Sequence, residues 1–249
     1  MSKNIIEHYH NSAERLLLFD YDGTLAEFAS TPAEAVPSEA LLSLLSSLAA
    51  DSANTVVIIS GRDGPTLEAW LGHLPLHFVA EHGHFTKAPG QPWHSDPHLD
   101  LSWKQPVRRL MESIHLDGSW IEEKSAALVW HYFNSDPDQG LLAAEGLSQE
   151  LLNLNLPIKI IAGHRVVEVS APGANKGTAA RDWLAKGEYD FILGAGDDTT
   201  DEDLFHALPA TAHKLKIGSH WPDGQAAFAT PAELREFLAE LVSSGITGK

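Results

Sequence analysis

Five short apolar runs constrain the fold more than any other feature, because each ends at a glycine, serine or acidic residue and helical patterns lie between them. The runs are apolar along their whole length, which is typical of parallel strands covered on both faces. Strands that alternate with helices predict an α/β fold, with a parallel sheet between layers of helices. The predicted strands are Arg15–Phe19, Asn54–Ile59, His77–Ala80, Tyr189–Leu193 and Leu215–Ile217. The predicted helices are Ser38–Ala50, Gly64–Leu71, Asn175–Leu184, Thr200–Leu208 and Pro231–Val242.

The middle of the chain breaks this rhythm. Ala88–Asp96 is rich in proline and glycine and is typical of a linker. After it, the order helix, two strands, helix, two strands predicts an α+β unit of the αββαββ type. We therefore expect residues 91–171 to be an insert in a core made of residues 1–90 and 172–249. The predicted elements of the insert are helices Leu99–Ile114 and Gln139–Asn153 and strands Ser119–Glu123, Ala126–Phe133, Ile158–Ile161 and Val166–Val169.

Composition excludes several classes of function. The 249 residues include 34 Asp plus Glu against 17 Lys plus Arg, which gives a formal net charge of −17. Such an acidic chain argues against nucleic acid and anionic membranes as partners, since both are bound by basic patches. The sequence has no cysteine, which excludes disulfides, thiolate zinc sites and thiol nucleophiles. No signal-peptide pattern is present at the N-terminus, so we expect a cytoplasmic protein, and a monomer is favoured.

Polar residues directly follow three of the predicted parallel strands. Asp20 and Asp22 follow the first strand, Ser60 follows the second, and Asp197 follows a later one. Because ligands of parallel α/β sheets bind outside the carboxyl ends of the strands, we expect these side chains to converge. Clustered carboxylates raise one another's pKa unless a cation compensates, and a hard divalent cation does this best. The pattern therefore indicates a Mg²⁺ site, and Mg²⁺ is the usual partner of phosphate substrates.

The same residue types suit phosphoryl transfer. One carboxylate beside Mg²⁺ can attack phosphorus, and a second can pass a proton to the leaving oxygen and later take one from water. Lys176, expected at the start of a helix, and the hydroxyl of Ser60 can meet the charge of the transferring group. Taken singly, Asp-x-Asp also fits a turn, Lys176 a surface lysine, and the run GDDTTDED a helix N-terminus. The occurrence of all of them in order at strand ends favours the functional interpretation.

Histidines raise the alternative of a transition-metal site. Their spacings are irregular, many of them fall in predicted loops, and no cysteine accompanies them, so we do not expect such a site. The candidates are His73, His77, His82, His84, His94 and His98.

The motifs together resemble those of the haloacid-dehalogenase-like phosphohydrolases, and among these the trehalose-6-phosphate phosphatases. The resemblance covers nearly the whole chain and implies a Rossmann-like core with the insert as a mobile, substrate-recognising cap. The matching stretches are DYDGTLAEF from Asp20, IISGR from Ile58, AEHG from Ala80, EEKSAALVWHYF from Glu122, PGANKG from Pro172 and GDDTTDEDLF from Gly196.

The resemblance also implies roles for individual residues. Asp20 would be the nucleophile and a Mg²⁺ ligand, Asp22 the general acid/base with its backbone carbonyl on Mg²⁺, and Asp197 the third ligand. Ser60 and Lys176 would hold the phosphoryl oxygens. Supporting positions around the metal would be Thr24, Asp198 and Asp201. Substrate-binding positions would be Gly61, Arg62, Glu81, His82, Gly83 and Asn175 in the core and Glu122, Lys124 and Glu168 in the cap.

The implied activity is Mg²⁺-dependent hydrolysis of trehalose 6-phosphate through an aspartyl-phosphate, a step of trehalose biosynthesis. One position departs from the family: Phe133 follows His131-Tyr132 where the family usually has arginine. Two alternatives stay open. The substrate can be another sugar phosphate, such as a glucosylglycerol phosphate or sucrose phosphate. Outside enzymes, the chain can be a Mg²⁺-dependent phospho-sensing module, although a sensor needs neither a cap nor an acid for a sugar leaving group.

Overall fold

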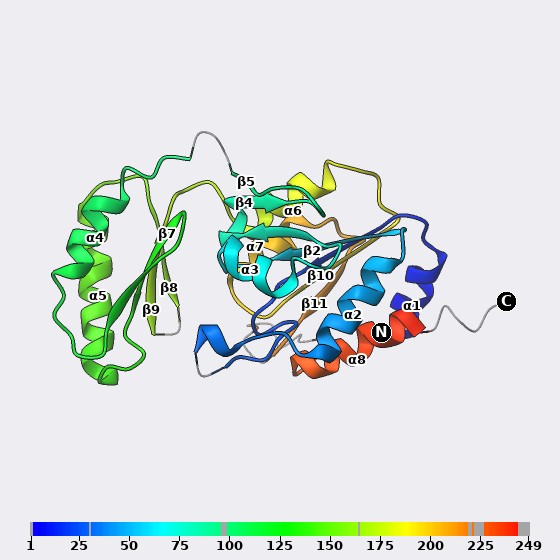
Figure 1. The fold of residues 1–249 in the computed structure, drawn as a ribbon, viewed down its shortest axis with the longest axis horizontal. Coiled ribbons are helices and arrows are strands. Elements are labelled where there is room, and N and C mark those ends of the chain that lie inside the picture. The colour runs from blue at the N-terminus through cyan, green and yellow to red at the C-terminus, as the bar shows by residue number, and fades with distance from the viewer. Residues whose placement is uncertain are drawn as a thin grey trace. The chain divides into compact units, whose positions relative to one another are not determined.

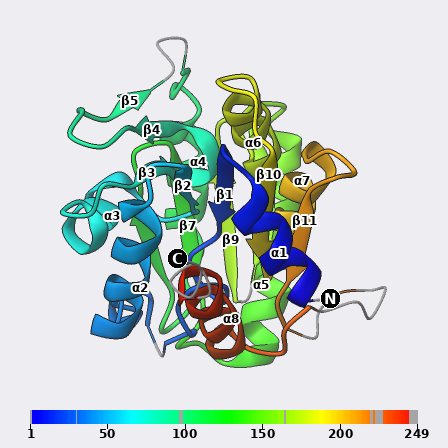
Figure 2. The same cartoon turned by 90° about the vertical axis from the view of Figure 1, so that its right-hand side faces the viewer.

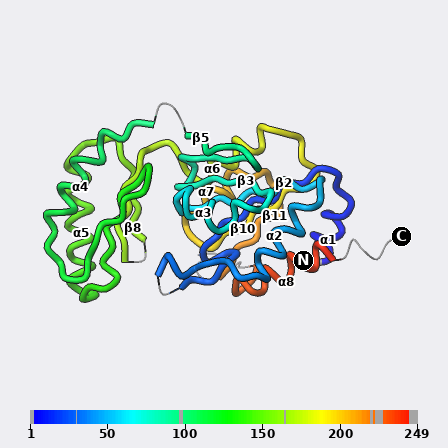
Figure 3. Tube along the Cα trace, viewed as in Figure 1, coloured from blue at the N-terminus to red at the C-terminus, as the bar shows by residue number. Residues whose placement is uncertain are grey.

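The computed structural model describes residues 2–29, 31–95, 99–163, 165–218, 221 and 227–243, without the side chain of Ser2. The chain divides into two compact units (Figure 1). Each unit has buried hydrophobic clusters of its own. The larger unit combines Met1–Ser95 with Asn175–Lys249, and the smaller unit is Asp96–Ala174. The segment that forms the smaller unit is inserted between the two segments that form the larger one, as the continuous trace in Figure 3 shows. Within the described part of the chain, no helix is long and apolar enough to cross a membrane.

The larger unit contains a seven-stranded sheet with the order β11-β10-β1-β2-β3-β4-β5. The first five strands in that order are parallel, and β4 and β5 pair antiparallel at one edge. This confirms the predicted α/β class with its parallel sheet. The strands are β1 (Arg15–Phe19), β2 (Asn54–Ile59), β3 (His77–Ala80), β4 (Phe85–Lys87), β5 (His94–Ser95), β10 (Phe191–Gly196) and β11 (His213–Lys216).

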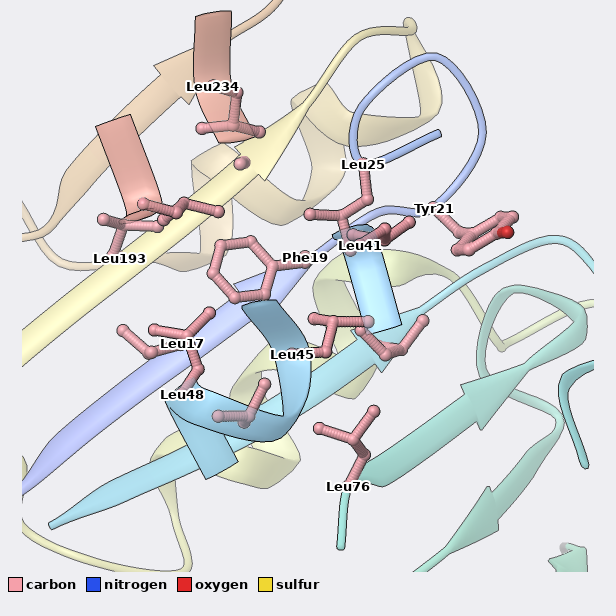
Figure 4. Close-up of a cluster of buried hydrophobic side chains, with 14 of the residues drawn as sticks. Leu17, Phe19, Tyr21, Leu25, Leu41, Leu45, Leu48, Leu76, Leu193 and Leu234 are labelled. Atoms are coloured by element: carbon pink, nitrogen blue, oxygen red, sulfur yellow. The ribbon is translucent and has the colours of Figure 1, made fainter. Parts of the chain in front are cut away.

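Helices cover both faces of this sheet because alternate residues of each strand point to opposite sides. Leu17 and Phe19 of β1 pack with the leucines of α2 (Figure 4), whereas Leu16 and Leu18 pack with α6 and α7. One layer contains α1 (Ser2–Asn11), α2 (Glu39–Ala50), α3 (Gly64–Leu71) and α8 (Pro231–Ser243). The other contains α6 (Lys176–Leu184) and α7 (Thr200–Ala207), as the turned view helps to follow (Figure 2).

The structure corrects several predicted elements of the larger unit. The helix α1 and the strands β4 and β5 were not predicted, because α1 buries only Ile5 and Tyr9 and the two strands are three residues and two residues long. As a result, His94–Ser95 is not part of a linker but pairs with β4. The strand β10 begins and ends later than predicted and extends through Gly194 and Gly196, residues that weaken a strand signal in sequence.

The smaller unit is an open antiparallel sheet with the order β6-β7-β9-β8 and two helices on one face, α4 and α5, which lie side by side in Figure 1. The chain order α4, β6, β7, α5, β8, β9 confirms the predicted αββαββ type. The core between helices and sheet includes Trp103, Trp130 and Leu147. The elements are α4 (Lys104–Glu112), β6 (Trp120–Glu123), β7 (Ala127–His131), α5 (Pro137–Asn153), β8 (Lys159–Gly163) and β9 (Val166–Ser170).

Candidate active site

The loop after β1 begins at the carboxyl end of the parallel sheet. The backbone N–H of Asp20 donates to Ala195 O of β10 at 3.0 Å, so the strand pairing fixes where the nucleophile candidate leaves the sheet. Gly23 then turns the chain with φ +74°, and a Cβ on it would lie 2.2 Å from Asp197 Oδ2. Only glycine fits this position, because the backbone is left-handed and a carboxylate occupies the space of a side chain.

Three buried carboxylates and one buried ammonium form the centre of the site. Asp20, Asp197 and Asp201 each offer one oxygen, and these oxygens all lie within 4.8 Å of one another. Lys176 Nζ lies 2.8 Å from Asp20 Oδ1 and 2.8 Å from Asp201 Oδ1. The hydroxyl of Thr24 lies 3.3 Å from Asp20 Oδ2 and 3.2 Å from Asp197 Oδ1. Asp20 and Asp197, which follow β1 and β10, therefore lie together as expected from their strand-end positions. Lys176 joins them from the start of α6 and Asp201 from α7.

Burial sets the electrostatics of this cluster. It raises the pKa of the Asp20 carboxyl to about 6, with Lys176 opposing and Asp201 adding to the rise. Burial likewise raises the pKa of Asp197, and the neighbouring charges of Asp20 and Asp201 raise it further. Burial lowers the pKa of Lys176, but Asp20 and Asp201 outweigh burial, so the net shift is upward and the ammonium keeps its proton. Three carboxylates thus share one cation, which leaves negative charge for a second cation to neutralise.

The residues present fit a Mg²⁺ ion. The donor set is oxygen only, as hard divalent cations require. Asp20, Asp197 and Asp201 can each offer one oxygen to such an ion. Asp201 is in addition held within the protein at both of its oxygens. Asp201 Oδ1 meets Lys176, and Asp201 Oδ2 accepts the backbone N–H groups of Asp197 and Asp198 at 3.2 Å each. Gly196 permits this approach, since a Cβ there would lie 2.2 Å from the Asp201 carboxyl carbon.

Asp22 is separate from the three-carboxylate cluster, and its side chain pairs with Arg62. Arg62 Nε and Nη2 donate to the two Asp22 carboxylate oxygens at 2.7 and 2.6 Å. The guanidinium also lies 4.4 Å from the ring centroid of Trp70 and donates to Pro32 O at 2.8 Å. Burial raises the pKa of the Asp22 carboxyl, whereas Arg62 lowers it. Tyr21 between the two aspartates points away and packs in the sheet core, where its hydroxyl donates to Ala35 O.

A strained loop after β3 lies beside the end of β2. Ser60 is buried, and the N–H groups of Glu81 and His82 donate to Arg62 O and Ser60 O at 2.9 and 3.0 Å. Glu81 and His82 have φ values of +47° and +58°, in the left-handed region that non-glycine residues rarely adopt. A Cβ on Gly61 would lie 2.6 Å from His82 Nε2, so the imidazole packs over that glycine. Such strain is typical of functional sites, and no sequence pattern predicted it.

The start of α6 places Lys176. Asn175 caps the helix, accepting the Thr178 N–H at 2.7 Å, while its own N–H donates to the Thr178 hydroxyl at 2.9 Å. A Cβ on Gly177 would lie 2.4 Å from Asp203 O, so this glycine lets α6 pack against α7. Asn175, expected to bind substrate, therefore has its side-chain oxygen in a helix cap.

The three cap positions lie together in the smaller unit. Lys124 Nζ is 3.2 Å from Glu168 Oε2, and Glu122 Oε2 is 2.8 Å from His131 Nε2. Sequence reasoning gave no role to His131, although it stands in the matched stretch before Phe133. Among the described residues, the group of three or more His, Cys, Asp or Glu that could hold a metal consists of Asp20, Asp197 and Asp201. His98 lies outside the described residues.

The parallel sheet, the inserted α+β unit and the acidic strand ends define a haloacid-dehalogenase-like protein. Within that class, the chain belongs to the trehalose-phosphatase family, whose model matches residues 18–230. It is 38% identical over 256 residues to "Trehalose-phosphatase" of Schizosaccharomyces pombe, an alignment covering 94% of this chain and 31% of that protein. It is 42% identical over 212 residues to "Alpha,alpha-trehalose-phosphate synthase [UDP-forming] B" of Dictyostelium discoideum, covering 83% and 27%.

A solved structure agrees with this membership. The C-terminal domain of trehalose-6-phosphate phosphatase from C. albicans matches with a TM-score of 0.88 and 31% identity, covering 97% of this chain and 96% of that one. The chain thus spans a whole solved domain but less than a third of the length of the two curated relatives.

Proposed function

We propose that this chain hydrolyses trehalose 6-phosphate to trehalose and inorganic phosphate. The observation that carries the proposal is the buried group of Asp20, Asp197, Asp201 and Lys176 at the carboxyl end of the sheet, in a chain that belongs to the trehalose-phosphatase family. Membership of the family supports trehalose 6-phosphate as the substrate, and the cluster supports the chemistry of phosphoryl transfer.

Asp20 is the proposed nucleophile. One of its carboxylate oxygens attacks phosphorus in line, the bond to the sugar oxygen breaks, and an aspartyl-phosphate forms. Asp20, Asp197 and the backbone carbonyl of Asp22 would hold Mg²⁺, which supplies positive charge against the phosphoryl oxygens. Lys176 and Ser60 hold the same oxygens from the protein side, and Asp201 keeps Lys176 in place through the contact at 2.8 Å.

Asp22 is the proposed general acid and base. It gives its proton to the departing sugar oxygen and then takes one from the water that attacks the aspartyl-phosphate, which releases phosphate and restores Asp20. The pairing of both Asp22 oxygens with Arg62 means that Arg62 must release Asp22 before a proton can pass. A phosphate dianion is the natural partner to draw the guanidinium away, because Arg binds carboxylate and phosphate in the same forked geometry.

The smaller unit is proposed as the cap that selects the sugar, with Glu122, Lys124 and Glu168 as partners of its hydroxyl groups. Carboxylates accept and ammonium groups donate several hydrogen bonds, which suits a neutral polyol. The expected insert, residues 91–171, overlaps this unit, which spans Asp96–Ala174.

The direct test is phosphate release from trehalose 6-phosphate, with Mg²⁺ and after chelation. We expect turnover that requires Mg²⁺ and that falls by at least about a thousandfold in Asp20→Asn, since the nucleophile is lost. Wild-type turnover in Asp20→Asn would contradict the assignment of the nucleophile.

A second candidate function rests on Phe133, which replaces the arginine usual in the family and so leaves room for a different sugar phosphate. Assays with sucrose 6-phosphate and a glucosylglycerol phosphate discriminate the two. Turnover of either ester with none on trehalose 6-phosphate would replace the proposed substrate. A protein that takes up phosphate on Asp20 and never releases it would instead be a phospho-sensing module.

A further inference from the structure

The open face of the smaller unit's sheet carries an exposed tryptophan beside a charged group. In β6, Ile121 packs toward the helices, so its neighbours Trp120 and Glu122 point to the opposite face. In β9, Val167 and Val169 are buried in the same core, which places Glu168 on that opposite face as well. Helices α4 and α5 thus cover one face, while aromatic and charged side chains gather on the other.

His131 joins the tryptophan to the nearest carboxylate. The rings of Trp120 and His131, which are paired across β6 and β7, stack with centroids 4.4 Å apart and an interplanar angle of 2°. The same imidazole has Nε2 at 2.8 Å from Glu122 Oε2 and is buried. One face of the Trp120 indole is therefore fixed against the buried imidazole of His131. The same imidazole holds the carboxylate of Glu122, two residues along β6.

Both groups remain accessible. Trp120 is 41% exposed, even though tryptophan has the largest apolar side chain. The side chain of Glu122 is 36% exposed. Next to them, Lys124 and Glu168 form an ion pair at 3.2 Å. A flat apolar ring held rigidly at the edge of a group of hydrogen-bonding charges fits one ligand chemistry well, namely a pyranose. A pyranose ring has an apolar C–H face that packs on an aromatic face and a rim of hydroxyl groups that need donors and acceptors.

We propose that Trp120 is a specificity-determining residue that stacks against a pyranose ring of the substrate, with Glu122 bonding the hydroxyl groups of that ring. The inference deepens the proposed function and rests on it, because it assumes that the cap binds the sugar of a sugar phosphate. The stack on His131 fixes the indole plane before the sugar arrives, so little side-chain freedom is lost on binding.

The test compares Trp120→Ala and Trp120→Phe with wild type on two substrates, trehalose 6-phosphate and acetyl phosphate, which has no sugar ring. We expect Trp120→Ala to raise KM for trehalose 6-phosphate about tenfold with kcat close to wild type, and Trp120→Phe to recover most of the loss. The inhibition constant of trehalose should rise by the same factor. Hydrolysis of acetyl phosphate should be unchanged.

Leu142→Ala is the matched control, because Leu142 is 72% exposed on α5 in the helical layer of the same unit. This variant should change neither the hydrolysis of trehalose 6-phosphate nor that of acetyl phosphate. An unchanged KM and trehalose inhibition constant in Trp120→Ala would overturn the proposal, and so would an equal loss on acetyl phosphate, which would mark a structural effect.

The design separates this inference from the proposed function. If wild type hydrolyses a different pyranose phosphate but not trehalose 6-phosphate, the proposal of trehalose 6-phosphate as substrate is wrong. Comparing the two Trp120 variants with wild type on the ester that is hydrolysed then decides the role of Trp120. If wild type hydrolyses acetyl phosphate but no pyranose phosphate, the Trp120 proposal is overturned as well.

Discussion

At the scale of single residues, we expect the buried carboxyl group of Asp197 to lower the stability of the metal-free fold. Burial and the charges of Asp20 and Asp201 raise its pKa in the folded state, whereas in the unfolded chain it ionises near its ordinary value of about 4. Above that value, folding without a metal must return a proton to the carboxyl group or bury an extra charge. The contribution of Asp197 to stability is therefore present at low pH and lost as the pH rises.

Asp197→Asn removes this cost. We expect the metal-free variant to melt a few degrees above wild type at about pH 8 and to gain less at about pH 5, because an amide cannot ionise. We also expect it to lose the Mg²⁺-induced rise in melting temperature together with activity. Thermal melting in chelator and in Mg²⁺ at both pH values measures all of this.

Asp117→Asn provides the control for charge alone, since Asp117 is exposed. An Asp197→Asn protein that is less stable than wild type in chelator at both pH values would show that Asp197 is not an unfavourable charge in the metal-free fold.

At the scale of elements, the turn after β1 links backbone conformation to the proposed metal site. Gly23→Ala forces a Cβ into both a left-handed backbone and the space of the Asp197 carboxylate. We expect a loss of about 1–3 kcal/mol in the free energy of unfolding and a large loss of Mg²⁺ affinity. Chemical denaturation and Mg²⁺ titration measure the two effects.

Gly90→Ala is the matched control for that turn. Gly90 has φ +70°, close to the value at Gly23, but a Cβ there meets nothing within 4 Å. It should show the backbone cost alone and leave Mg²⁺ affinity unchanged. Equal effects of the two variants would mean that the contact with Asp197 does not matter.

The elements also show what a sequence can predict. Strands β1, β2 and β3 were predicted to the residue, because apolar runs with polar ends leave little choice. The strand ends also predicted that Asp20 and Asp197 lie together. Other features escaped for different reasons. The strands β4 and β5 are only three and two residues long, and Glu81 and His82 adopt a left-handed backbone that non-glycine residues rarely take. The pairing of Asp22 with Arg62 joins residues far apart in the sequence. No local pattern records a contact made forty residues away along the chain.

At the scale of the whole molecule, the net charge of −17 opposes the approach of a phosphate dianion. The proposed substrate must reach a local cationic site against a repulsive field, and salt screens that field within about 10 Å at 0.1 M ionic strength. We expect KM for the sugar phosphate to fall severalfold as a monovalent salt is raised at saturating Mg²⁺, while kcat changes little. A KM that rises with salt would show that local attraction outweighs the overall charge.

The central claim is that Asp20 forms the aspartyl-phosphate intermediate. The most direct test is mass spectrometry of the Asp22→Asn variant, quenched in acid after mixing with Mg²⁺ and trehalose 6-phosphate. Without the proposed base at residue 22, hydrolysis of the intermediate should slow, and the peptide that contains Asp20 should gain the mass of one phosphoryl group. Phosphate release with no modification of that peptide, or modification of a different residue, would contradict the mechanism.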